Sequence, residues 1–162
     1  MKSITEEFLD YLSKALTEKE IAVATAESCT GGLIGHVLTN ISGSSAYFER
    51  GIISYSNNAK MELLDVSHRL LTDYGAVSAE VAEAMAIGIR KNAGVDIGIS
   101  TTGIAGPTGG TKEKPVGLVY IGLSNADITM VHRFQFSGSR LENKNQTCAE
   151  ALHLLADFID MS

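Results

Sequence analysis

The stretch that most constrains the fold of this chain is residues 21–35, where a short apolar run changes abruptly into a glycine-rich turn. Residues 21–26 are small, mostly apolar and partly β-branched, which is typical of a strand buried on both faces. From residue 33 the apolar positions follow helical spacing, and they are Leu33, Ile34, Val37 and Leu38. We therefore predict a strand–turn–helix unit, with the polar turn at the carboxyl end of the strand, where open α/β sheets bind their ligands.

The turn between this strand and this helix reads Glu27-Ser28-Cys29-Thr30-Gly31-Gly32. The first N–H groups of a helix lack intrahelical partners, so with the helix dipole they attract an anion or a developing oxyanion. An ordinary N-capped turn explains the same residues equally well. No lysine follows the glycines, so the stretch is not a Walker A loop, and it lacks the G-x-S-x-G pattern of a nucleophile elbow.

The rest of the chain alternates between helical and strand-like patterns. Helices are predicted over residues 4–17, 61–64, 66–74 and 78–92 and from residues 137–140 onward, and strands over 47–55, 95–102, 116–124 and 128–136. The last two strands form a hairpin. This order predicts an α/β fold, a three-layer α/β/α single domain over residues 1–162 with a mixed β-sheet.

Composition narrows the classes of partner. The net charge of -6 and the pI near 5.2 argue against a duplex-DNA binder, which needs a basic face. No run approaches the ~18–20 apolar residues of a membrane span. The acids Glu6 and Glu7 interrupt the start of the chain before any apolar core, so no signal peptide is expected. The two cysteines are too few for a disulfide framework, and we expect no nucleic acid, no membrane and a reduced cytoplasmic setting.

Two glycine-rich loops, residues 27–32 and 103–117, each follow a predicted buried strand. We expect residues 95–102 to lie beside residues 21–26 in one sheet, so that the two loops converge on one site, where glycines let backbone N–H groups approach an anion closely. The longer loop could also be a flexible surface loop, although loops of this length are often functional.

Two adjacent residues, Ser28 and Cys29, are candidate nucleophiles. Neighbours on an extended segment point to opposite sides, so only one of them faces a ligand, and a small cysteine commonly packs in the core. A serine needs a base. The histidines show no triad-like or metal-like spacing, and they are His36, His68, His132 and His153. Lysine is another known base when its pKa is lowered, which makes Lys60 a candidate, although a solvated lysine is the usual interpretation.

Seven short motifs run in order through nearly the whole chain. They are Ala26-Glu27-Ser28-Cys29-Thr30-Gly31-Gly32, Gly43-Ser44-Ser45, Tyr55-Ser56-Asn57-Asn58-Ala59-Lys60, Gly75-Ala76-Val77-Ser78, Gly103-Ile104-Ala105-Gly106-Pro107-Thr108-Gly109-Gly110, Lys114-Pro115-Val116-Gly117 and Phe136-Ser137-Gly138-Ser139-Arg140. In this combination the chain resembles the C-terminal domain family of competence/damage-inducible protein A, the CinA C-terminal family, and in particular its stand-alone nicotinamide-nucleotide amidohydrolases. The N-terminal molybdopterin-binding-like domain of longer relatives is expected to be missing, together with its activity.

The resemblance implies hydrolysis of the carboxamide of nicotinamide mononucleotide to nicotinic acid mononucleotide and ammonia, without a metal or other cofactor, in a homodimer. Its serine, lysine and tyrosine match Ser28, Lys60 and Tyr55, with Tyr55 as a proton relay and the oxyanion held by N–H groups near Thr30 and Gly31. The expected substrate-binding residues are Thr30, Gly31, Gly32, Ser44, Ser45, Gly103, Ala105, Gly106 and Arg140. Among them the loop 103–110, Ser44, Ser45 and Arg140 are the candidates for the substrate phosphate. The alternative is a non-catalytic nucleotide-binding or regulatory module linked to competence or the DNA-damage response.

Overall fold

The computed structural model describes residues 1–161, which form six α-helices, one short 3-10 helix and five strands. In chain order these are α1 (Glu6–Glu18), β1 (Val23–Glu27), α2 (Leu33–Thr39), η1 (Ser44–Ala46), β2 (Phe48–Ile53), α3 (Asn57–Leu64), α4 (His68–Tyr74), α5 (Ala79–Ala93), β3 (Ile97–Gly103), β4 (Leu118–Ser124), β5 (Thr129–Gln135) and α6 (Arg140–Ile159). All the predicted helices and strands are confirmed, with ends that differ by a few residues. The largest difference is in α3, which begins four residues early because the Ser56 hydroxyl accepts the Ala59 N–H and caps the helix.

The five strands form one mixed sheet in the order β2-β1-β3-β4-β5. Strands β2 and β3 both run parallel to β1, whereas β3–β4 and β4–β5 are antiparallel pairs. The prediction that residues 95–102 lie beside residues 21–26 is confirmed. Glu27 pairs with Thr101, so the chain leaves β1 and β3 at the same edge of the sheet.

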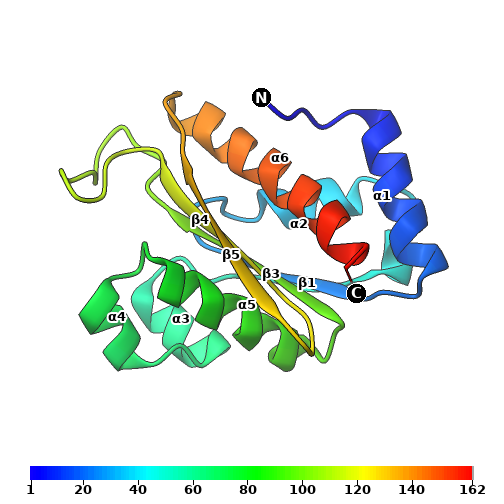
Figure 1. The fold of residues 1–162 in the computed structure, drawn as a ribbon, viewed down its shortest axis with the longest axis horizontal. Helices are drawn as coiled ribbons and strands as arrows, with labels where there is room; N and C mark the ends of the chain where they lie inside the picture. Colours follow the sequence, from blue (N-terminus) through cyan, green and yellow to red (C-terminus); the bar gives the residue numbers. More distant parts are fainter. Residues whose placement is uncertain (162) are drawn as a thin grey trace.

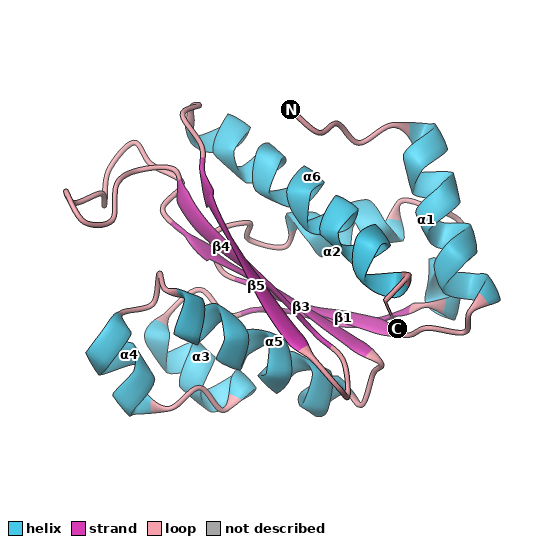
Figure 2. Cartoon of the chain, viewed as in Figure 1, coloured by secondary structure: helices cyan, strands magenta, loops and turns pink. Residues whose placement is uncertain are grey.

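Helices cover both faces of the sheet, as Figures 1 and 2 show, and the predicted three-layer α/β/α arrangement is confirmed. Helices α1, α2 and α6 lie on one face, and α3, α4 and α5 lie on the other. Successive side chains of β1 alternate between the two apolar cores, because Val23 packs in the first core while Ala24 and Ala26 pack in the second. Every residue of β1 is buried, as its small apolar sequence predicts.

The long loop between β3 and β4 continues the antiparallel pairing of these two strands. The Ile104 N–H donates to the Leu118 carbonyl at 2.9 Å, and the Gly117 N–H donates to the Ile104 carbonyl at 2.7 Å. Nearer the tip, the Thr111 N–H donates to the Lys114 carbonyl at 2.8 Å. The alternative interpretation of a flexible surface loop is therefore wrong for its base, which is an ordered extension of the hairpin. Within residues 1–161, no helix is long and apolar enough to cross a membrane.

Candidate active site

Ser28 is the first residue after β1 and lies at the carboxyl end of the central parallel strands. Its N–H donates to the Thr101 carbonyl on β3 at 3.0 Å, which continues the pairing of the two strands by one residue. The Gly31 N–H donates back to the Ser28 carbonyl at 3.2 Å and closes the turn into α2. The serine is only 8% exposed, so its hydroxyl lies in a sheltered position at the sheet edge.

The amine of Lys60 lies directly against the Ser28 hydroxyl. Its Nζ is 2.9 Å from Ser28 Oγ, 2.9 Å from the Ser54 carbonyl and 3.1 Å from the Tyr55 carbonyl. A neutral amine has two N–H donors and one lone pair. The amine donates to the two carbonyls and to Ser28 Oγ. In its neutral form the two N–H groups would serve the carbonyls, and the lone pair would accept the Ser28 O–H. This is the geometry that a general base requires.

Lys60 is 1% exposed, so the usual interpretation of a solvated lysine is wrong. The side chain is buried because α3 starts immediately beyond β2 and places Lys60 in its first turn, facing the sheet edge. Burial lowers the pKa of Lys60 from its ordinary value of 10.5, because a charged amine loses its hydration there. Among residues 1–161, no carboxylate forms an ion pair with this amine that would offset the loss.

Ser28 and Lys60 border a cavity of about 170 Å³. Its lining residues are Ser28, Cys29, Tyr55, Lys60, Ala76, Val77, Thr102, Gly103, Ala105 and Arg140. The structure thus brings together the predicted catalytic residues with three of the predicted binding residues, from four separate motifs. Sequence reasoning missed Ala76, Val77 and Thr102 as site residues. The position of Thr102 at the end of a buried strand was the available signal, and its hydroxyl donates to the Ala76 carbonyl at 2.7 Å.

Tyr55 and Arg140 stand at the mouth of this cavity. The Arg140 guanidinium donates to the Gly106 carbonyl at 2.8 Å and to the Tyr55 hydroxyl at 3.2 Å. The Tyr55 residue is 61% exposed, and its hydroxyl is bonded to Arg140. The predicted relay through this hydroxyl is not formed, because Lys60 contacts Ser28 directly and only the backbone carbonyl of Tyr55 reaches the lysine.

Cys29 packs into the apolar core between the sheet and α6, although it also borders the cavity. Burial raises the pKa of its thiol to about 12, because a thiolate would lose its hydration. The thiol therefore stays protonated near neutral pH and is a poor nucleophile. Of the two adjacent candidates, Ser28 is the one that contacts a base.

The Gly31, Ile34 and Gly35 N–H groups at the start of α2 are already bonded within the protein, which corrects the expectation that Gly31 donates to an oxyanion. The buried carboxylate of Glu27 accepts the N–H groups of Ile34 and Gly35 at 2.9 and 3.0 Å and the Thr30 hydroxyl at 2.7 Å. The Gly31 N–H is already bonded to the Ser28 carbonyl. The anion at this helix end is therefore the protein's own carboxylate, a contact that the spacing of residues in the sequence does not reveal.

Ser44 and Ser45 lie far from the catalytic pair, which corrects a second expectation. Both belong to η1, which precedes β2, and the first residue of β2, Phe48, pairs with Val23 at the amino end of β1. Because β1 and β2 are parallel, these serines lie at the opposite end of the sheet from Ser28. Ser44 and Ser45 precede β2, and Ser28 follows its parallel neighbour β1, so the length of these strands separates the serines from Ser28 within one chain.

The histidines take no part in this cavity, whose lining contains none of them. Within residues 1–161, no group of three or more histidine, cysteine, aspartate or glutamate side chains is placed to hold a metal ion. The chemistry that this cavity offers is therefore that of a serine hydroxyl beside a buried amine, with a guanidinium at the rim.

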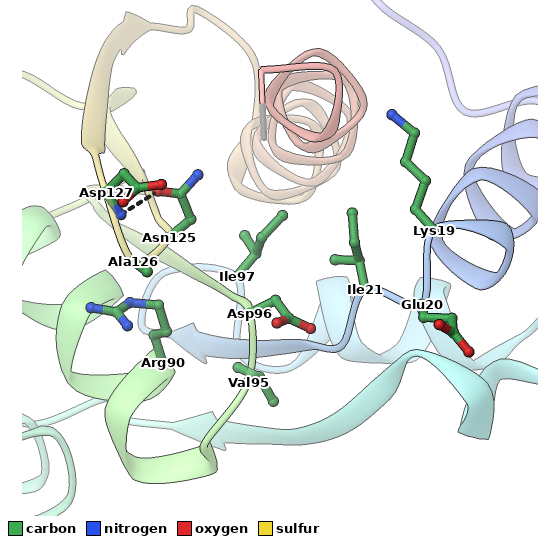
Figure 3. Close-up of a pocket in the computed structure, with 10 residues that line it drawn as sticks. All are labelled: Lys19, Glu20, Ile21, Arg90, Val95, Asp96, Ile97, Asn125, Ala126 and Asp127. Carbon is green, nitrogen blue, oxygen red and sulfur yellow. Dashed lines mark hydrogen bonds between the residues drawn. The ribbon is translucent and has the colours of Figure 1, made fainter.

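A larger pocket of about 590 Å³ lies at the other end of the sheet, near the amino ends of β1 and β3 (Figure 3). Three of its charged residues, Asp96, Arg90 and Lys19, form structural contacts. The Asp96 carboxylate accepts the Ala22 N–H at 2.8 Å, the Arg90 guanidinium donates to Ser124 Oγ at 3.3 Å, and Lys19 pairs with Asp160 at 3.4 Å. This pocket contains no nucleophile paired with a base.

Similar proteins give the fold and the site their family context. Curated relatives include a CinA-like protein of Geobacter sp. (strain M21), 49% identical over 154 residues, and a putative competence-damage inducible protein of Caldicellulosiruptor bescii, 53% identical over 140 residues. These matches cover 95% and 86% of this chain but only 37% and 34% of the relatives, so the chain spans little more than a third of their length.

Solved structures agree along almost the whole chain. The competence/damage inducible protein CihA from Agrobacterium tumefaciens has a TM-score of 0.92 at 38% identity and covers 97% of this chain and 98% of its own. A CinA superfamily protein from Klebsiella pneumoniae 700603 has a TM-score of 0.94 at 29% identity, covering 99% and 100%. The sequence profile of the CinA C-terminal domain matches residues 5–159, and the chain belongs to this family.

Proposed function

We propose that this chain is a serine amidohydrolase that converts nicotinamide mononucleotide to nicotinic acid mononucleotide and ammonia. The observation that carries the proposal is the 2.9 Å contact between Lys60 Nζ and Ser28 Oγ in a buried site. A serine beside an amine of lowered pKa is a nucleophile–base pair suited to acyl transfer. The motif resemblance supplies the substrate class.

The dimensions of the cavity are consistent with this substrate. A cavity of ~150 Å³ is enough for benzene. The cavity of about 170 Å³ at Ser28 therefore suits a single substituted ring such as the pyridine carboxamide, with the ribose and phosphate outside its mouth. The positive charge of the pyridinium ring lowers the pKa of Lys60 further when the substrate binds, because like charges disfavour protonation of the amine.

The reaction proceeds in two halves. In the first, Lys60 Nζ takes the proton of Ser28, and Oγ attacks the carboxamide carbon. The C–N bond then breaks as Lys60 returns the proton to the leaving nitrogen, so that ammonia departs and a nicotinoyl ester remains on Ser28. In the second half, Lys60 takes a proton from water, the hydroxide attacks the ester carbon, and the proton passes to Ser28 Oγ as the acid product leaves.

The test is ammonia release from nicotinamide mononucleotide by the purified chain, with a chelator present to remove adventitious metal. We expect one ammonia for each nicotinic acid mononucleotide formed. Binding of the nucleotide in calorimetry without any ammonia would overturn the enzymatic proposal and favour a non-catalytic nucleotide-binding module. Absence of both binding and ammonia would exclude this substrate.

A further inference from the structure

A second cavity, of about 320 Å³, lies on the other side of the turn that carries Ser28. Its lining residues are Thr30, Gly31, Gly32, Leu33, His36, Leu141, Lys144 and Asn145. We propose that this cavity binds the phosphate group of the substrate, with Lys144 as the principal cation. The inference rests on the proposed function and moves the phosphate subsite away from Ser44, Ser45 and Arg140.

This cavity and the Ser28 cavity share two structural elements, which places them next to each other. The hydrogen bond from the Gly31 N–H to the Ser28 carbonyl keeps both residues within one tight turn. On α6, Arg140 borders the Ser28 cavity and Lys144 borders the second one. Four residues along a helix advance about 6 Å, so the two cations lie one turn apart on one helix face. A mononucleotide with its carboxamide at Ser28 can extend its phosphate across this turn.

The amine of Lys144 lies against the glycine turn. A Cβ atom built on Gly31 would lie 3.6 Å from Lys144 Nζ, and Gly31 has a φ of +60°, a conformation that glycine adopts without strain. The absence of a side chain at Gly31 leaves the space beside the amine open to a ligand. His36 borders the same cavity, and its Nε2 lies 3.3 Å from the Asn40 side-chain amide nitrogen.

Lys144 carries a positive charge that the described residues do not neutralise. Among residues 1–161, ion pairs engage other lysines, including Lys2, Lys14 and Lys19, but none engages Lys144. The acid nearest to it on α6, Glu142, uses its carboxylate to accept the Ser139 N–H at 2.6 Å. The Ile34 and Gly35 N–H groups do not contribute to this site, because Glu27 already accepts both of them. The lysine is thus the group that would recognise a phosphate, as a point charge.

The decisive variant is Lys144→Met, which removes the charge and keeps much of the side-chain volume. We expect the KM for nicotinamide mononucleotide to rise about tenfold to hundredfold with little change in kcat, the range for one charge-assisted hydrogen bond. Turnover of nicotinamide riboside, which lacks the phosphate, should not change. Lys14→Met on the exposed face of α1 is the matched control and should affect neither substrate. An unchanged KM for the nucleotide, or an equal loss with both substrates, would overturn the proposal.

A binding measurement separates this inference from the proposed reaction. The probe is inorganic phosphate, which the enzyme cannot turn over. In an NMR titration it should shift the backbone amide resonances of Gly31 and Gly32 saturably in the wild-type chain and not in Lys144→Met. Amide shifts that depend on Lys144, without ammonia release from the nucleotide, would support the phosphate subsite and reject the proposed reaction. Ammonia release without these shifts would support the reaction and overturn the subsite.

Discussion

The two ends of the sheet differ in the volume of the cavity found there, in the burial of its charged side chains and in whether those charges are paired. The pocket at the amino ends of β1 and β3, drawn in Figure 3, has a volume of about 590 Å³, and the cavity at the carboxyl ends has one of about 170 Å³. At the amino ends, the acids Asp96 and Asp127 are exposed, and the cations already bond to protein atoms. At the carboxyl ends, by contrast, Lys60 is 1% exposed, lacks an ion-pair partner among residues 1–161 and contacts a serine hydroxyl.

In this comparison the candidate site is distinguished by the burial of an unpaired titratable group and not by the volume of its cavity. In water, charges are screened and pKa values stay near their reference values. A buried amine without a counter-charge has a lowered pKa, and such groups concentrate at functional sites. The larger pocket contains more charges, but its acids Asp96 and Asp127 are exposed and its cations Arg90 and Lys19 bond to protein atoms.

The largest effect is expected when one buried serine hydroxyl is removed at each end of the sheet. Ser28→Ala should lower ammonia release at least about a thousandfold, because no nucleophile remains, while the chain stays folded. Ser124→Ala, at the other end, removes a hydroxyl that bonds Arg90 and Thr129, so it should lower the free energy of unfolding by about 1 kcal/mol and leave turnover intact. Steady-state rates and urea denaturation of both variants provide the measurement. A Ser124→Ala chain that is folded but inactive would contradict the assignment of the site to one end.

The second test exchanges lysines. Lys60→Arg should lose about 10²–10⁴-fold in kcat, nearly as much as Lys60→Ala, because a guanidinium cannot give up its proton and act as a base. Lys19→Arg at the amino end conserves a charge near the surface and should have no effect on the rate. Turnover of the three variants should be measured beside a substrate-binding control. Near-wild-type turnover by Lys60→Arg would remove lysine from the role of base.

The third test is the pH dependence of the rate. The base must be unprotonated, so kcat/KM should rise about tenfold per pH unit until the pH passes the pKa of Lys60 in the free enzyme. Because burial lowers that pKa, the rise should end below the ordinary lysine value of 10.5. Between the lowered pKa and 10.5 the unfolded chain binds more protons than the folded chain, so the free energy of unfolding should also rise with pH there. A pH–rate profile with its inflection at the ordinary lysine value would contradict the effect of burial.

The smallest effect concerns two carboxylates that each bond backbone N–H groups, one at each end. Glu27→Gln should lower the free energy of unfolding by about 1–3 kcal/mol, because two N–H groups and two threonine hydroxyls lose a charged acceptor in a largely buried setting. Asp96→Asn should cost less, since its bond to the Ala22 N–H lies at the surface. Denaturation midpoints of the two variants give the comparison. Equal losses would show that burial does not control the strength of these contacts.

Much of the fold could be predicted from local patterns. The apolar faces of α5 and α6, the Ser78 and Ser139 caps and the β4–β5 hairpin depend on residues near one another in the sequence, and all are present. The adjacency of β1 and β3 was also predicted, from the convergence of two glycine-rich loops. The positions of Ser44 and Ser45 were predicted wrongly. The order of motifs along the chain does not tell at which end of the sheet each motif lies.

Local patterns in the sequence are sufficient to locate the strand–turn–helix unit and the residues able to act as nucleophile and base, because periodicity and residue chemistry are local properties. The burial of Lys60 against Ser28, the contact of Glu27 with the start of α2 and the position of Lys144 beside Gly31 come from the packing of the folded chain. Each of these facts depends on side chains from separate elements that meet in space. Burial by those elements lowers the pKa of Lys60. The sequence alone therefore favours a solvated lysine, whereas the folded chain makes the same residue a candidate base.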